Sequence, residues 1–246
     1  AILALVFNLK CNRELNISMK GFRPNGYLIV QIYKVGAPSI VVQAIGSLMT
    51  YGMNLILAAF GSAQTVFGIY FKLQSFVFMP VFGLNNGMVP IIAYNYGAGH
   101  KDRVIKTIKH SVAYGVGIMF AGLLAMHIFP AQLMRMFDAE ESLIAIGAPA
   151  LETISLSFVF AGFCIVAGSV FQALGNGVYS MIVSVARQMC VLLPVAKLLS
   201  LSGEVTLIWW AFPIAELASV LLTSYFLVRI YRKVICHIGE PVVQDA

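Results

Sequence analysis

Four ionisable residues stand deep inside long apolar segments of this sequence, and they are its clearest candidates for chemistry. They are Lys72, Glu152, Arg187 and Glu216. Each lies about seven to ten residues from the nearer end of its segment, which is roughly 10–15 Å along a helix. If the segments cross a membrane, a charge at this depth costs a few kcal/mol or more and usually faces a bundle interior or a cavity. These side chains are therefore candidates for a substrate or ion site.

Glu216 allows two interpretations. It shares a helix face with Ser219 and Thr223, and an apolar setting favours the neutral form of a carboxyl group, so it could take up a proton as a proton-coupled carrier requires. Alternatively, Glu216 and Lys72 form a buried structural ion pair. Arg187 stays charged, which favours structural anchoring or contact with an anionic group.

A weakly polar stripe runs along the first long apolar segment. Its members are Ser39, Gln43, Ser47, Thr50 and Asn54. Their spacing of three or four residues places them on one helix face, where lipid is unfavourable because polar groups in an apolar medium need partners. The stripe fits the wall of a wet cavity, with Gln43, Ser47 and Asn54 as candidate lining residues, or else a set of interhelical hydrogen bonds.

No motif for covalent or metal chemistry accompanies these charges. The sequence has no Gly-x-x-x-x-Gly-Lys phosphate loop, no His-Glu-x-x-His and no Gly-x-Ser-x-Gly. Its four cysteines and four histidines show no metal-ligand spacing. We therefore expect no catalytic residue, no bound metal and no cofactor beyond a coupling ion, and we do not expect an enzyme.

Six long apolar segments carry these residues. They cover approximately 35–60, 64–96, 104–129, 143–173, 179–199 and 205–230. A bilayer core about 30 Å thick needs about 20 apolar residues per helix, and each segment meets that length. Hydrophobic residues make up 60% of the chain and charged residues 11%, unlike a soluble domain. We expect an all-α integral membrane protein with six transmembrane helices.

The charges between the segments alternate in sign and orient the helices. Lys101 and Arg103 lie between the second and third segments, and Lys106 and Lys109 lie at the start of the third. Other basic residues precede the first segment and follow the last. The opposite loops carry acidic residues and Arg135 alone. Cytoplasmic loops hold the excess of Lys and Arg, so both ends of the six-helix block are expected in the cytoplasm. The net charge of +6 reflects this orientation, and no nucleic-acid partner is expected.

Prolines and small residues should shape the helices. The second segment is too long for a straight crossing, so Pro80, Gly83, Gly87 and Pro90 are expected to bend it or carry it beyond the membrane. Two ridges of small residues should let helices approach closely. They are Ala113, Gly117, Ala121 and Ala125 in the third segment, and Ala211, Ala215, Ser219 and Thr223 in the sixth.

One motif resembles a known family. Residues 78–104 read FMPVFGLNNGMVPIIAYNYGAGHKDRV, which closely resembles the end of the second helix of each lobe in multidrug and toxic compound extrusion (MATE) transporters. Residues 36–43 (GAPSIVVQ), 171–177 (FQALGNG) and 184–194 (SVARQMCVLLP) are similar to the same family. In the motif, Gly97 and Gly99 are suited to end a helix and allow a tight turn, and Asn95 is placed to hydrogen-bond that turn.

The resemblance implies that the six helices form the C-terminal lobe, helices seven to twelve, of a two-lobed transporter. Residues 1–9 would then end a truncated preceding transmembrane helix, and 10–27 would be the cytoplasmic inter-lobe linker. Residues 28–233 would form the lobe itself, and 234–246 a cytoplasmic tail. The hinge and structural residues of the motif would be Pro80, Gly83, Asn95, Gly97 and Gly99.

The chain departs from patterns found in parts of this family. Where some members place an acidic residue on the seventh helix for cation coupling, this region has Gln43 and Ser47. Where some carry an aspartate midway along the tenth helix, it has Ala161 and Gly162. These departures argue against a cation site of that kind. Glu216, in the run PIAE, resembles an acidic position found in one branch.

The charges and the polar stripe favour a carrier with a polar cavity, and the resemblance implies a secondary active multidrug efflux transporter of the cell inner membrane. It would export amphipathic, cationic organic compounds by H⁺ or Na⁺ antiport with alternating access. Its partners would be the lipid bilayer, the N-terminal lobe missing from this sequence and small-molecule drugs. One alternative is a lipid-linked oligosaccharide flippase of the same superfamily. Such a protein would need more cationic side chains in its cavity to bind the pyrophosphate of its substrate. The other is a non-transporting membrane scaffold, which needs no buried charge.

Overall fold

The computed structural model describes residues 25–239, and within this range it contains helices and no strand. The chain divides into two units, Ala1–Gly36 and Ala37–Ala246. The second unit contains all the helices discussed below, apart from the start of the first one. The boundaries expected for the preceding helix and the linker, at 1–9 and 10–27, fall almost entirely outside the described residues.

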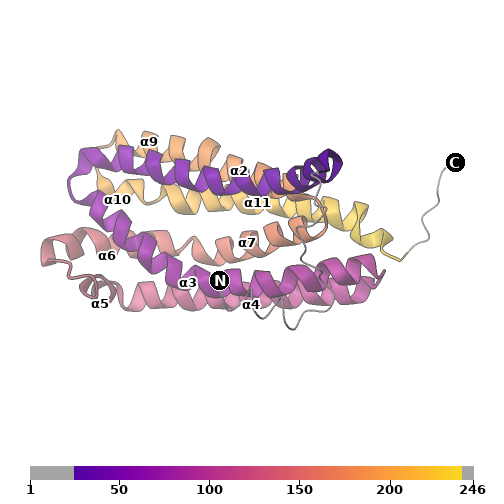
Figure 1. Cartoon of the computed structure of the whole chain (residues 1–246). Coiled ribbons are helices and arrows are strands. Elements are labelled where there is room, and N and C mark those ends of the chain that lie inside the picture. Colours follow the sequence, from indigo (N-terminus) through magenta and orange to yellow (C-terminus); the bar gives the residue numbers. More distant parts are fainter. Residues whose placement is uncertain (1–24, 240–246) are drawn as a thin grey trace, which may run out of the picture. The chain divides into compact units, whose positions relative to one another are not determined.

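The helices follow one another with short connections (Figure 1). In chain order they are α2 (Gly26–Leu57), η1 (Ala58–Phe60), α3 (Ala63–Gly97), α4 (Lys101–Ile128), α5 (Pro130–Arg135), α6 (Glu141–Ser155), α7 (Phe158–Ala173), α8 (Gly177–Val185), the π-helix η2 (Ala186–Leu192), α9 (Leu193–Ser200), α10 (Val205–Ile208), α11 (Ala211–Lys233) and η3 (Ile235–His237).

Five helical runs in the described range are long and apolar enough to cross a membrane, and α6 with α7 makes a sixth if that bent pair is one span. The six expected segments correspond to α2, α3, α4, α6–α7, α8–α9 and α10–α11. The predicted all-α, six-span membrane fold is therefore confirmed.

The fourth span is broken rather than straight. α6 and α7 meet at a bend of 48°. The Ser155 hydroxyl donates to the carbonyl of Glu152 at 3.0 Å, and the Ser157 hydroxyl donates to that of Ile154 at 2.7 Å. These bonds satisfy backbone carbonyls that the interrupted helix frees, which lets a bend persist in an apolar medium. Pro149 lies inside α6 and not at the bend.

The α3 helix continues through Pro80 and Pro90 without a break in its assignment. Figure 1 shows its first half crossing obliquely and its second half running beside α4, with which it packs extensively. The prediction that this long segment changes direction is therefore confirmed.

A tight turn follows α3, as the motif predicts. Gly99 has a positive φ of 73°, a conformation that favours glycine. The His100 amide donates to the Asn95 carbonyl at 2.9 Å. The Asn95 side chain differs from the expectation, because its amide donates back along the helix to the Ile91 carbonyl at 2.8 Å.

Glycines let α7 pack closely between α4 and α11 (Figure 1). A Cβ added at Gly162 of α7 would lie 3.0 Å from the carbonyl oxygen of Gly115 on α4. A Cβ added at Gly115 would lie 2.7 Å from Val166. The two helices can therefore approach this closely only without side chains at these positions.

The two expected ridges of small residues have different outcomes. On α11, Ala211, Ala215, Ser219 and Thr223 are buried, which confirms that ridge. On α4, the expected ridge is exposed within the described bundle, and its role in helix packing stays a prediction. The close contact uses Gly115 instead, on another face of the same helix.

The residues directly after α11 also differ from the expected tail. Ile235 is 2% exposed and Ile238 is 9% exposed, and both pack in the hydrophobic core. The Lys101 ammonium donates to the Cys236 carbonyl at 2.8 Å. Residues 234–238 therefore belong to the packed bundle because their apolar side chains find burial there.

Candidate functional site

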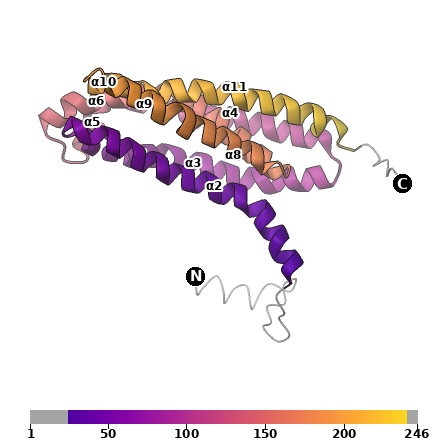
Figure 2. The same ribbon diagram turned by 90° about the horizontal axis from the view of Figure 1, so that it is seen from above.

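Two of the four deep charges form an ion pair. Arg187 Nη1 donates to Glu216 Oε2 at 3.0 Å, and the side chains are 32% and 5% exposed, respectively. The pair links η2 to α11, two elements that pack against each other. Figure 2 shows the continuous run from α8 to α9 lying beside α11.

Arg187 lies in an irregular part of its helix. It lies in η2, where the α-helical run from Gly177 to Ser200 adopts π-helical hydrogen bonding. A π-turn inserts an extra residue and rotates the neighbouring side chains relative to a regular α-helix, and such turns are frequent at functional sites. Sequence reasoning missed this element, because a π-turn has no clear compositional signature. The one sequence signal was an arginine inside an apolar run.

The polar face of α11 is as the sequence predicts. Glu216, Ser219 and Thr223 are 4%, 1% and 1% exposed. Glu216 Oε1, Ser219 Oγ and Thr223 Oγ1 find no hydrogen-bond partner among the described residues. A buried polar atom left unpaired costs about 1–3 kcal/mol. This face therefore has unused capacity for water, a proton or a small cation.

Lys72 does not pair with Glu216, so that interpretation of the sequence is wrong. The Lys72 ammonium lies 5.6 Å from the centroid of the Phe137 ring, which is within range of a cation–π interaction. Its side chain is exposed. Lys72 and Arg187 lie at similar depths in the sequence pattern, but helix packing brings only Arg187 to the carboxylate.

The remaining candidates occupy separate positions. Glu152 is half-buried on α6, three residues before the end of that helix at the bend. Gln43 and Ser47 are exposed on α2. Asn54 is half-buried, and its amide donates to the Thr50 carbonyl at 2.9 Å. Their roles as cavity residues stay predictions.

The described residues contain no group of three or more His, Cys, Asp or Glu side chains placed to hold a metal ion. The charges of the site come instead from one guanidinium and one carboxylate. This arrangement is a charge pair between two helices, and it offers no nucleophile–base dyad for covalent chemistry.

Membrane-spanning helices, one of them broken, with a buried charge pair between two of them, define a polytopic membrane protein. The chain belongs to the MatE family, whose model matches residues 38–198. The Multidrug export protein MepA of Staphylococcus haemolyticus (strain JCSC1435) is 25% identical over 231 residues, which are 93% of this chain and 50% of that protein. The protein of the same name from Staphylococcus aureus (strain MSSA476) is 26% identical over 218 residues, 88% of this chain and 48% of its own length.

Solved structures agree with this membership. The MATE multidrug transporter DinF-BH is 32% identical with a TM-score of 0.81, and the match covers 93% of this chain and 52% of that one. A MATE in the bent conformation has a TM-score of 0.84 at 18% identity, covering 98% of this chain and 54% of that one; this second likeness concerns the fold alone. The resemblance to MATE transporters is confirmed, and the chain spans about half the length of the relatives it matches, as expected for one lobe.

Proposed function

We propose that this chain is the C-terminal lobe of a secondary active exporter that moves amphipathic, cationic organic compounds in exchange for H⁺ or Na⁺. One observation carries the proposal: a membrane-spanning helix holds a carboxylate, Glu216, that is 4% exposed, has one oxygen bonded to Arg187 and has the other unpartnered among the described residues. An intramembrane carboxylate is expensive and usually serves an ion or substrate pathway.

The pair supplies a means of coupling. When a proton or Na⁺ binds Glu216, the charge attraction that holds Arg187 is weakened, and the contact between η2 and α11 becomes easier to open. Loss of the proton or ion restores the pair. An ion that binds one arrangement more tightly than the other shifts the population between them, which alternating access requires.

The substrate class rests on the relatives and on the exposed part of α2. MepA is named as a multidrug export protein, and DinF-BH is named as a MATE multidrug transporter. Gln43 and Ser47 are exposed polar residues on a membrane-spanning helix. In the two-lobed protein they would line a path for amphipathic compounds together with the other lobe.

A flippase for lipid-linked oligosaccharides is less well supported. Its pyrophosphate would need cations that are free to bind it. Arg187 is committed to Glu216, and Lys72 stands over an aromatic ring. A non-transporting scaffold would not need a charge pair inside its helices.

The test uses the whole two-lobed protein in a strain that lacks its main drug exporters. Ethidium efflux is measured from cells, and uptake is measured in inverted vesicles under an imposed pH gradient or an imposed Na⁺ gradient. We expect one of the two gradients to drive transport, and we expect Glu216→Gln to abolish the dependence of transport on that gradient. The control variant Glu141→Gln, at an exposed acid on α6, should change neither the transport rate nor its dependence on the gradient. Equal transport with and without either gradient would count against antiport.

A further inference from the structure

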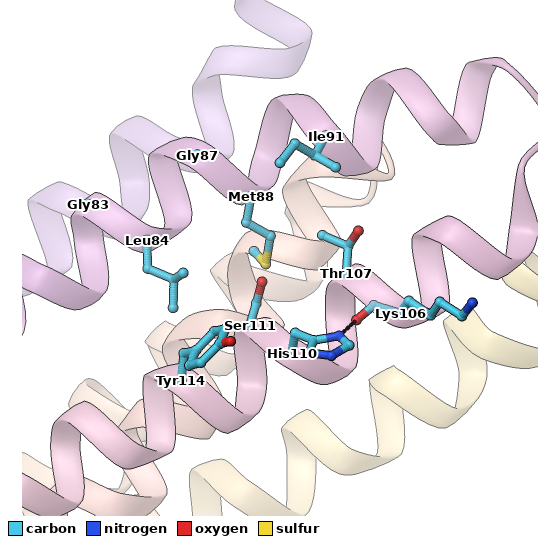
Figure 3. A pocket seen from close by; sticks show the side chains of 10 residues that line it. All are labelled: Gly83, Leu84, Gly87, Met88, Ile91, Lys106, Thr107, His110, Ser111 and Tyr114. Carbon is cyan, nitrogen blue, oxygen red and sulfur yellow. Dashed lines mark hydrogen bonds between the residues drawn. The ribbon is translucent and has the colours of Figure 1, made fainter.

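A groove of about 460 Å³ opens between the second half of α3 and the first half of α4. Figure 3 shows Gly83 and Gly87 on one side of it, with the side chains of Leu84 and Met88 directed toward α4. On the α4 side, Tyr114 lies at the end nearest Leu84, and Thr107 lies at the other end. The groove is separate from the Arg187–Glu216 pair, which involves η2 and α11.

The glycines of α3 keep this groove open. A Cβ added at Gly83 or at Gly87 would meet no atom within 4 Å. These two positions therefore do not serve close helix packing, in contrast to Gly115, where a Cβ would lie 2.7 Å from Val166. Because these two glycines lie one turn apart and carry no side chain, they leave an apolar strip along the surface of α3.

The groove has a polar end and an apolar end. Lys106, Thr107 and His110 line it near the start of α4, and Tyr114 lines its far end. Eight residues of helix separate Lys106 from Tyr114, which is about 12 Å. No carboxylate is among its lining residues, and the first turns of α4 also carry Lys101, Arg103 and Lys109 against Asp102 alone.

Lys106 supplies the free donor of the polar end. The Thr107 hydroxyl donates to the Arg103 carbonyl at 2.8 Å. His110 Nδ1 donates to the Lys106 carbonyl at 2.7 Å, so Nε2 is the nitrogen left over, and it donates to an anion only in the imidazolium form of the ring. In Figure 3 the Lys106 side chain extends away from Tyr114, on a flexible stem. Lys106 lies five residues after the start of α4, and a lysine near the end of a membrane helix can extend its ammonium to the level of the lipid headgroups.

We propose that this groove binds one anionic phospholipid of the surrounding bilayer. Its phosphate lies at the Lys106 ammonium, beside His110, and one acyl chain lies along Gly83 and Gly87 toward Tyr114. The charge of the polar end, the absence of a carboxylate in the lining and the apolar strip all match a phosphate joined to a hydrocarbon chain. A basic pocket between membrane helices is a known form of site for acidic headgroups.

The first test is native mass spectrometry of the purified two-lobed protein. It is titrated with phosphatidylglycerol or with phosphatidylcholine of the same acyl chains. We expect phosphatidylglycerol to be retained preferentially, and Lys106→Gln with His110→Gln to weaken its binding about fivefold or more and to remove the preference. Lys109→Gln removes one charge from the same helix at a residue that does not line the groove, and we expect it to keep the preference.

The second test fills the groove. A Cβ added at Gly87 meets no atom within 4 Å. We expect the side chain of a Gly87→Leu variant to occupy the apolar strip, and so to lower binding of both lipids while the thermal unfolding midpoint stays unchanged. Gly68→Leu is the control, at another glycine of α3 where an added Cβ meets no atom within 4 Å, and it should not lower the binding of either lipid. Equal binding of the two lipids by the unmodified protein, or lipid binding that survives both groove variants, overturns the proposal. The proposal is also overturned if a photo-reactive amino acid that replaces Ile91 cross-links to the other lobe instead of to lipid.

Discussion

Arg187 and Glu216 stand 29 residues apart in the sequence and form a 3.0 Å ion pair between two membrane-spanning elements. Desolvation of a nearly buried carboxylate is costly, and the attraction of the guanidinium offsets that cost only while the two groups stay together. The pair can be a fixed clamp or a contact that opens when Glu216 binds an ion. These roles differ in what happens when one partner, or both, is neutralised.

Removing the charge of Glu216 should destabilise the protein, because Arg187 then stays in the bundle without its partner. Breaking a buried pair costs about 3–5 kcal/mol, and we expect the lower end of this range for Glu216→Gln, since the Arg187 side chain is 32% exposed. The thermal midpoint of the purified two-lobed protein and its cellular abundance report this loss. Unchanged stability would show that Arg187 is readily solvated.

Removing both charges should restore stability. The double variant Glu216→Gln with Arg187→Met leaves no unpaired charge, and replacing a buried pair by uncharged groups is often neutral or stabilising. If the pair couples transport, the double variant is abundant but does not respond to the ion gradient. If abundance and gradient-driven ethidium efflux both return, the pair is a structural clamp.

Neutralising Glu141 of the exposed pair Arg135–Glu141 should cost much less stability than neutralising Glu216 of the pair Arg187–Glu216, although the two pairs have nearly the same N–O distance. In the exposed pair these atoms are 2.9 Å apart, but the side chains are 62% and 79% exposed. Surface ion pairs contribute about 0–1 kcal/mol, so Glu141→Gln should leave the thermal midpoint within about two degrees. A loss as large as that of Glu216→Gln would mean that burial does not explain the difference.

Neutralising Lys72 should cost little and should not rescue Glu216→Gln. An exposed cation–π contact such as that with Phe137 contributes about 0.5–1 kcal/mol. Lys72→Met and Phe137→Leu should therefore lower the unfolding free energy by similar small amounts. Restored abundance in the double variant Glu216→Gln with Lys72→Met would instead support a pair between these two residues.

Adding one methyl group at Gly162 should push α4 and α7 apart. The new Cβ would lie 3.0 Å from the Gly115 carbonyl oxygen, a backbone atom that moves only with its helix. Overpacking of this kind typically costs about 1–3 kcal/mol. Gly117→Ala is the matched control on α4, because a Cβ there meets nothing within 4 Å. Thermal unfolding of both variants compares the two positions directly.

The orientation of the helices can be tested by labelling. In the two-lobed protein with its native cysteines replaced, Lys109→Cys should react with an impermeant maleimide only after cells are opened. Ser202→Cys, in the turn between α9 and α10, should react in intact cells. These outcomes follow from the excess of Lys and Arg in cytoplasmic loops. The reverse pattern would contradict the proposed placement of both ends of the block in the cytoplasm.

Several properties of this protein follow from the order of its residues alone. About twenty apolar residues in succession can be stable only across a bilayer or in a large core, so the six spans are readable without coordinates. The 3.6-residue period places Glu216, Ser219 and Thr223 on one face, and the structure buries all three. The motif around Gly99 predicts its turn, because a positive φ favours glycine.

The tertiary structure alone decided which groups meet across helices. Lys72 and Arg187 are both cations at similar depth, and Arg187 is the one that meets Glu216 because η2 packs against α11. Likewise, α4 carries small residues on two faces, and only its packing against α7 selects Gly115 over Gly117. A helix's period is local and can be read from the chain, whereas the partner of each face depends on how whole helices pack, which no local pattern encodes.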